Sequence, residues 1–167
     1  MAAGSTYTPI ATTTFGGSST SYTFTSIPST YTDLRLIVSF PSTSSTNFST
    51  RVGNGSVDTA SNYGATRLYG VGSGSGSSDT QTNNNFFSGN VGVGTNGSVS
   101  VNEIMNYANT TTYKTVINRY NDASGIVMLI VGCWRSTSAI NTLQVYTTTG
   151  TNFASGTMAT LYGIAAA

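Results

Sequence analysis

The chain has 167 residues, enough for one domain with a hydrophobic core, and 38% of them are hydrophobic, which argues against a charge-extended disordered chain. Only 7% are charged, and the net charge is +1. The six Lys and Arg residues are scattered along the chain, which argues against nucleic acid as a partner, because phosphate binding needs clustered cations.

The first predicted elements are extended segments separated by a glycine-rich turn. Ser5–Thr13 is a first extended segment, and Gly16–Ser19 is a turn. Tyr22, Phe24 and Ile27 then continue a β pattern, because they are apolar or aromatic side chains that suit a pleated surface.

The clearest predicted strand is Asp33–Phe40, which follows a proline turn at Pro28. Its apolar residues stand at every second position and therefore share one face: Leu34, Leu36, Val38 and Phe40. Arg35 lies on the other face, so we expect a partner subunit or a loop to cover its charge.

The middle of the chain is polar and rich in turn signals. Asn54-Gly55 predicts a tight hairpin turn, because both residues tolerate positive φ, and Asn62–Tyr69 predicts a short strand. Gly70–Ser78 is almost entirely Gly and Ser, so we predict a flexible surface loop, which Gln81–Asn85 extends.

We predict a hairpin after this loop. A strand over residues 86–93 is joined by an Asn96-Gly97 turn to a strand within Ser98–Tyr107. Tyr113–Tyr120 alternates again, as expected for a half-buried strand.

The most apolar run of the chain is Ile126–Trp134, which is typical of a strand covered on both faces. Strands around Leu143 and over Met158–Ile164 close the chain, and no helical period appears. The pattern predicts an all-β single domain, a sandwich of two antiparallel sheets with about 8–10 strands. Residues 1–15 form an extended N-terminal arm or a first strand, and residues 16–167 form the sandwich.

Groups suited to catalysis are scarce. There is no His, and the single cysteine, Cys133, predicts a buried core residue rather than a nucleophile. The carboxylates are Asp33, Asp58, Asp79, Asp122 and Glu103. A glycosidase pair drawn from these stays open, although four of the five lie in or beside turns, where Asp commonly caps its own backbone. We therefore predict that the protein is not an enzyme.

Two patterns resemble ligand sites and are rejected. Gly92–Gly97 matches the glycine spacing of dinucleotide-binding loops, but a strand pattern follows it where that motif needs a helix. Asp58, Asn62 and Asp79 are oxygen donors suited to calcium, but their spacing fits no established loop. We predict no cofactor and no metal.

Four segments resemble a family of small virion proteins of tailed bacteriophages, cyanophages among them. The similar segments are Ser26–Ser39, Asn62–Gly70, Ile104–Val116 and Thr160–Ile164. The resemblance implies a jelly-roll sandwich that forms a homotrimer and decorates a capsid, or that lies on a tail fibre. The shared motifs are turns and strands, so the resemblance assigns no catalytic residue.

Two functions follow as expectations. The first is a capsid decoration (cement) protein on the virion surface, which binds the major capsid protein and stabilises contacts between capsomers. It has no nucleic-acid or membrane partner, and it is made in the host cytoplasm, because the N-terminus lacks the segments of a signal peptide. Candidate capsid or subunit contacts are Tyr7, Pro9, Ile10, Phe15 and Arg35. The alternative is a tail-fibre module that recognises host surface glycans with exposed Tyr and Asn side chains and with the Gly/Ser loop 70–78.

Overall fold

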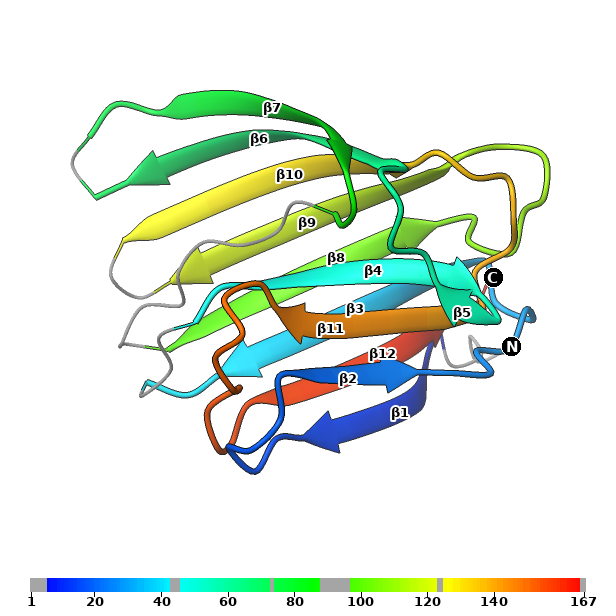
Figure 1. The fold of residues 1–167 in the computed structure, drawn as a ribbon, viewed down its shortest axis with the longest axis horizontal. Coiled ribbons are helices and arrows are strands. Elements are labelled where there is room, and N and C mark those ends of the chain that lie inside the picture. Colours follow the sequence, from blue (N-terminus) through cyan, green and yellow to red (C-terminus); the bar gives the residue numbers. More distant parts are fainter. Residues whose placement is uncertain (1–5, 43–45, 73, 88–96, 123–124, 166–167) are drawn as a thin grey trace, which may run out of the picture.

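A computed structural model of the chain describes residues 6–42, 46–72, 74–87, 97–122 and 125–165, and these form two antiparallel β-sheets (Figure 1). The eight-stranded sheet has the order β1 (Tyr7–Thr14), β12 (Met158–Ile164), β3 (Asp33–Phe40), β8 (Ser98–Met105), β9 (Lys114–Asp122), β10 (Ile126–Trp134), β6 (Tyr63–Val71) and β7 (Ser77–Asn84). The four-stranded sheet has the order β2 (Ser21–Phe24), β11 (Thr142–Thr147), β4 (Phe48–Asn54) and β5 (Ser56–Val57). The predicted all-β, jelly-roll-like sandwich of two antiparallel sheets is confirmed.

The hydrophobic core lies between the two sheets. The alternation predicted for β3 is confirmed, because its even-numbered residues from Leu34 to Phe40 are all buried. Val52 of β4 and Leu143 and Val145 of β11 are fully buried on the four-stranded sheet. Each strand thus buries one row of side chains, which is the usual origin of a sandwich core.

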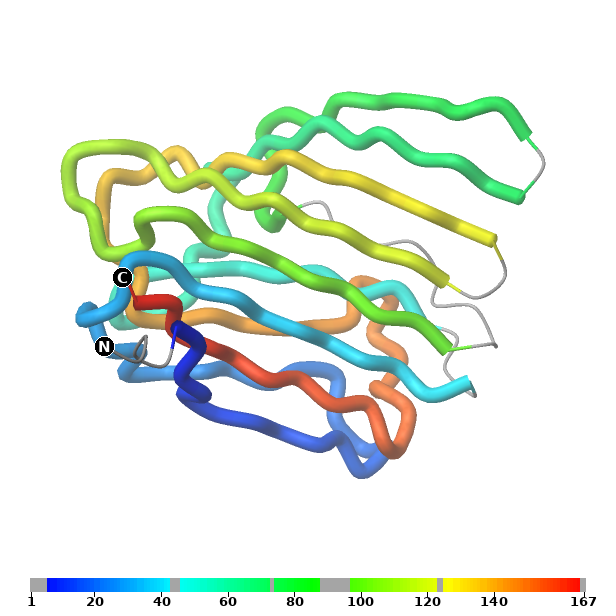
Figure 2. Tube along the Cα trace, turned by 180° about the vertical axis from the view of Figure 1, so that it is seen from behind, coloured from blue at the N-terminus to red at the C-terminus, as the bar shows by residue number. Residues whose placement is uncertain are grey.

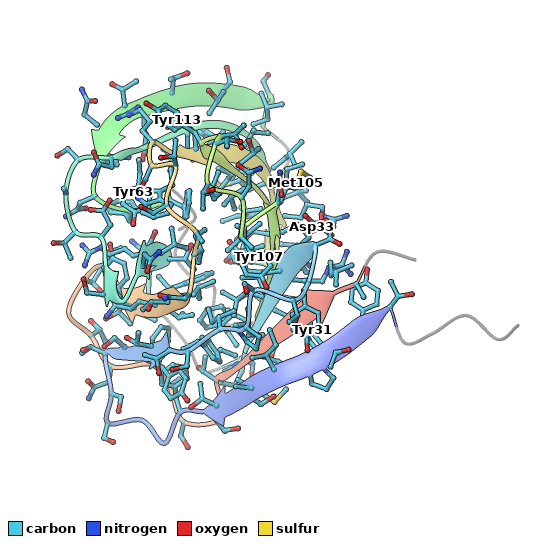
Figure 3. All side chains as sticks on the ribbon, turned by 90° about the vertical axis from the view of Figure 1, so that its right-hand side faces the viewer. Tyr31, Asp33, Tyr63, Met105, Tyr107 and Tyr113 are labelled. Atoms are coloured by element: carbon cyan, nitrogen blue, oxygen red, sulfur yellow. The ribbon has the colours of Figure 1, made fainter. Side chains whose placement is uncertain are left out.

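The chain turns into β3 through a segment fixed by side-chain hydrogen bonds. Ser26 has a φ of 54°, and Tyr107, fully buried, donates a hydrogen bond from its hydroxyl to the carbonyl oxygen of Pro28. At the beginning of β3, Asp33 accepts a hydrogen bond of 2.6 Å from the backbone N–H of Asn106. Figure 3 shows Tyr107, Tyr31 and Asp33 around this end of β3.

The polar stretch predicted as a loop is in part a strand. Within the predicted loop, β6 continues to Val71, and β7 begins at Ser77 and includes most of Gln81–Asn85. The prediction missed β7 because an exposed edge strand needs no apolar residues. Its pairing with β6 is supported instead by Thr66 and Thr80, whose hydroxyl oxygens lie 3.3 Å apart.

One predicted hairpin is confirmed and another is wrong. The Asn54-Gly55 turn joins β4 to β5, and Gly55 has a φ of 77°. The predicted pairing of β8 with a strand over 86–93 is not formed, because β3 and β9 occupy both edges of β8, and Asn96 of the predicted turn lies outside the described residues. The strand predicted for 86–93 lies mostly outside the described residues, although Phe87 forms an isolated bridge with Thr50.

The N-terminal segment is part of the sandwich from Tyr7 onward. Strand β1 pairs with β12 at the edge of the eight-stranded sheet, with a bulge between Pro9 and Ala11. Phe15, directly after β1, is buried, and its ring centroid lies 4.2 Å from that of Phe153. The described part of residues 1–15 is therefore a first strand of the domain and not a separate arm.

Candidate interaction surface

Strand β10 is covered on one face only. Met128 and Ile130 point to the core and are buried, whereas Val127, Leu129 and Val131 point outward and are exposed by 65%, 40% and 49%. The prediction that both faces of this strand are covered is therefore wrong. The four-stranded sheet packs against one face of the larger sheet. The described residues place no element over the other, outer face, which is turned towards the viewer in Figure 2.

The outer face is more apolar than the covered face along β8. Ser98, Ser100 and Asn102 of β8 point inward and are buried, whereas the intervening Val99 and Val101 point outward. Such an arrangement costs free energy in an isolated subunit, because polar groups lose water while apolar groups keep it.

Hydrogen bonds partly offset the cost on the covered face. Asn118 of β9 donates through its side-chain amide to the Ser100 hydroxyl at 2.7 Å and to the Asn102 side-chain oxygen at 2.8 Å. Nearby on β9, Lys114 is fully buried, and its Nζ donates to the carbonyl oxygens of Thr112 and Thr137 at 2.9 and 3.3 Å. Burial lowers the pKa of this ammonium group.

Apolar residues of three strands, β8, β10 and β6, lie near one another on the outer face, with β9 between β8 and β10. The strand registers place Val101 opposite Arg119, Arg119 opposite Leu129 and Leu129 opposite Leu68, in one row across β8, β9, β10 and β6. We use the term apolar patch for six residues of this region: Leu68, Val99, Val101, Val127, Leu129 and Val131. A group of exposed apolar side chains on one face of a sheet is typical of an interaction site.

Three charged side chains lie in or beside the patch. Glu103 accepts a hydrogen bond from Arg35 of β3 and forms an ion pair with Arg119 of β9, in which the nitrogen and oxygen atoms are 2.9 Å apart. One carboxylate thus pairs with two guanidinium groups, so the three side chains together carry one net positive charge. A shallow hollow between β3, β8, β9 and β10 combines both arginines with Val99, Val101 and other patch residues.

The five predicted contact residues do not form one surface. Tyr7 and Pro9 are exposed on β1, and Ile10 is partly buried against the core. Phe15 is only 5% exposed, so it offers almost no area to a partner and is better described as a core residue.

Arg35 is covered from within its own chain. Glu103 of β8 pairs with it, and its guanidinium carbon lies 4.8 Å from the ring centroid of Tyr7. The sequence analysis missed this pairing because it depends on the register of β3 against β8, which local patterns do not reveal.

The carboxylates of the described residues make separate interactions. Asp79 pairs with Arg67, which lowers the pKa of Asp79, and Asp33 caps Asn106 as described above. Asp58 accepts hydrogen bonds from Asn62 at 2.9 Å and from the Trp134 indole N–H at 2.7 Å.

Burial raises the pKa of Asp58, but the hydrogen bonds from Asn62, Trp134 and the Ala60 backbone outweigh it, so the pKa lies below its usual value. Of the three predicted oxygen donors for calcium, Asp58 and Asn62 contact each other, whereas Asp79 pairs with Arg67 on the β6–β7 ladder. No cluster of three metal-ligating His, Cys, Asp or Glu side chains occurs among the described residues.

Cys133 is half-buried on the outer face of β10. The prediction that it is a buried core residue is therefore wrong. Its burial raises the pKa of the thiol, and Arg135 opposes this effect only in part. A raised pKa keeps the sulfur protonated and weakly nucleophilic.

The described residues contain no helix that is long and apolar enough to span a bilayer.

Comparisons with known proteins yield no family. No family model matches the chain, and no curated protein matches it significantly. Among solved structures, the Caenorhabditis elegans galectin LEC-6 is similar with 9% identity and a TM-score of 0.38, over 93% of this chain and 96% of the galectin. A toad ovary galectin, solved as a complex with thio-digalactose, is similar with 8% identity and a TM-score of 0.29, over 77% of this chain and 99% of that one. At these values the likeness carries no argument about ligands.

Proposed function

We propose that this protein is a structural subunit that binds another protein with the apolar patch. In its specific form, the proposal is a capsid decoration protein of a tailed bacteriophage, bound to the major capsid protein, as the resemblance of its turn and strand motifs implies. The observation that supports docking is the group of exposed aliphatic side chains on β6, β8 and β10, on the face opposite one that buries Ser and Asn.

The physical basis of such docking is removal of this surface from water. Burial of apolar area contributes about 25 cal/mol per Å² before the costs of association are subtracted. The Arg119 guanidinium beside the patch supplies a charge that fixes orientation, because Glu103 already serves Arg35 as well. A capsomer surface with an apolar area and an acidic side chain would complement it.

The test is reattachment to stripped heads. Val127→Asp places a charge within the apolar patch, and we expect at least a tenfold loss of binding to heads, measured by cosedimentation, while the fold is kept because Val127 is 65% exposed. The matched control is Val71→Asp. Val71 is 52% exposed, but it stands opposite Ile126 on the other face of the sheet, so binding should be unchanged.

Two results would contradict this proposal. If Val127→Asp binds heads as the wild type does, the apolar patch is not the docking surface. If stripped heads resist heat as well as complete ones, the protein does not stabilise the capsid. Deletion of residues 1–15 is a poor test, because it removes β1 and the buried Phe15 and would therefore disturb the fold.

Recognition of host glycans on a tail fibre is the second candidate. A hollow between β6, β7 and β10 favours it, because Leu68 and Val127 lie there beside the small residues Gly70, Ser77 and Ser78, which leave room for a ring. An array of host envelope glycans tests this candidate with the intact protein. Absence of binding to every glycan removes its support, and Val127→Asp should abolish any binding that is seen.

A further inference from the structure

The four edges of the two sheets are unequally protected against pairing with another strand. In the four-stranded sheet, β5 has two residues and β2 has four, too few for a stable ladder. In the eight-stranded sheet, β1 carries Pro9, which lacks an N–H, and a bulge follows it. Strand β7, at the other end, has eight residues and no Pro, and its bulge, between Gln81 and Asn84, lies towards the C-terminal end of the strand.

The side chains of β7 do not oppose pairing either. The strand reads Ser-Ser-Asp-Thr-Gln-Thr-Asn-Asn and contains no Lys and no Pro, the residues that commonly protect edges. Its single charge, Asp79, is already neutralised by Arg67 of β6, whose Nε donates at 2.6 Å. The ladder with β6 loses its register after Gln81, and Asn83 has a φ of 58°, so the regular part of the edge runs over 77–81.

We propose that β7 pairs with β7 of a second copy of this chain, antiparallel and about a two-fold axis, which joins the two eight-stranded sheets into one. A second copy is the occupant that fits, because β7 is the one edge strand of more than four residues without Pro among the described residues, and a two-fold contact brings two such edges together. This proposal is independent of the docking role proposed above.

The register of the contact follows from symmetry. Directly opposite residues of an antiparallel pair lie on the same face of a sheet, so a two-fold axis must centre on a residue paired with its own copy. The central residue of 77–81 is Asp79, and Thr80 follows it. Centring on Asp79 would set two carboxylates opposite each other, whereas centring on Thr80 sets Asp79 opposite Gln81 and Ser78 opposite Thr82.

The centred register also extends an existing row of hydroxyl groups. Thr66 and Thr80 are cross-strand neighbours within one chain, and the two copies together would form a row of four threonines across the contact. The outer faces of both sheets then point to the same side, so the dimer presents two apolar patches in one direction.

Charge substitutions at Thr80 test the contact and its symmetry. Thr80→Lys and Thr80→Asp each place like charges opposite each other, so each variant alone should raise the dimer dissociation constant by about tenfold or more. An equimolar mixture of the two should restore dimers, because opposite charges then meet. The measurement is sedimentation velocity of the full chain, with circular dichroism to verify that each variant is folded.

The matched control lies on the opposite edge of the same sheet. Thr12 of β1 also pairs with a threonine of the neighbouring strand, because its hydroxyl donates to that of Thr160 at 3.1 Å. Thr12→Lys should therefore leave the dimer dissociation constant unchanged.

The proposal is supported if the wild type is a dimer, if each Thr80 variant alone dimerises more weakly, and if the mixture of the two variants forms dimers again. A wild type that stays monomeric up to about 100 µM overturns it, as does a trimer, the state that the resemblance implies. Equal effects of Thr80→Lys and Thr12→Lys, or a mixture that stays dissociated, overturn the centred β7 contact even if the protein is dimeric.

Discussion

Strand β8 reverses the usual distribution of residues between the two faces of the sheet. The covered face holds the hydrogen-bonded group of Ser100, Asn102 and Asn118, while the outer face holds Val99, Val127 and other patch residues. Burial in the isolated subunit is therefore decided by the strands as units and not by each residue separately. The comparison indicates that the outer face is shaped for a surface that the subunit itself does not contain.

The neighbours of the polar group explain why the strands do not turn over. A shift of one residue would bury Val99 and Val101, but it would also expose Ile104 of β8 and Tyr120 of β9, which are now buried. The other strands of the sheet impose the same orientation through residues such as Leu36 of β3. The register is thus fixed by the sum over the sheet, and the polar group is accommodated by its own hydrogen bonds.

The largest expected contrast between the two faces lies on β10. Ile130 is 1% exposed and Leu129 beside it is 40% exposed. Ile130→Ala should lower the free energy of unfolding by about 2–5 kcal/mol, because it leaves a cavity, and Leu129→Ala by about 0.5 kcal/mol. Urea titrations followed by circular dichroism measure both, and similar losses for the two variants would mean that the outer face is covered in the subunit itself.

A smaller contrast is expected on β9 between two asparagines. Asn118→Ala should cost about 1–3 kcal/mol, because it leaves the buried Ser100 and Asn102 without their shared partner. Asn121→Ala, at an exposed position of the outer face, should change stability by about 0.5 kcal/mol or less. The same urea titration applies. An Asn118 variant as stable as the wild type would show that the polar group contributes nothing net.

The smallest contrast concerns pH. Burial raises the pKa of Tyr120 to about 12, a hydrogen bond with Ser98 opposes this and Asp122 adds to it. The unfolded chain releases this proton first, so stability should fall as pH rises from about 10 towards 12. Tyr120→Phe should weaken this decline, and Tyr113→Phe, at an exposed position, should not.

Unfolding free energies at about pH 9 and pH 11 give the test for each protein. The lowered pKa of Lys114 acts in the opposite direction, but it is common to all three proteins and cancels in the comparison. Equal declines for the wild type and Tyr120→Phe would place the alkaline sensitivity elsewhere.

Sequence patterns predicted the β class and the core face of β3, because alternation such as Leu34, Leu36 and Val38 is a local property. They could not predict which face of β10 is covered, because its inward Met128 and Ile130 and its outward Val127 and Leu129 are equally apolar. The alternation of Ser100 and Val101 was visible, but it does not state which side receives the second sheet. Prediction of the apolar patch would therefore have required the register of four strands.

The missed strand has a different cause. Strand β7 is almost entirely polar, and prediction from apolar alternation has no signal to use there. A usable signal was the run of β-compatible threonines, Thr80 and Thr82, after the glycine-rich stretch. The ion pair of Arg67 with Asp79, which supports this strand, joins residues across the predicted loop and becomes apparent only in three dimensions.

Trp134, which donates a hydrogen bond to Asp58, can report on unfolding. Trp134 is the only tryptophan of the chain and is 3% exposed on the covered face. Its intrinsic fluorescence is therefore a single-site reporter of unfolding, with no label attached. A partner bound on the outer face would leave that emission unchanged, so folding and docking can be followed separately in the same sample.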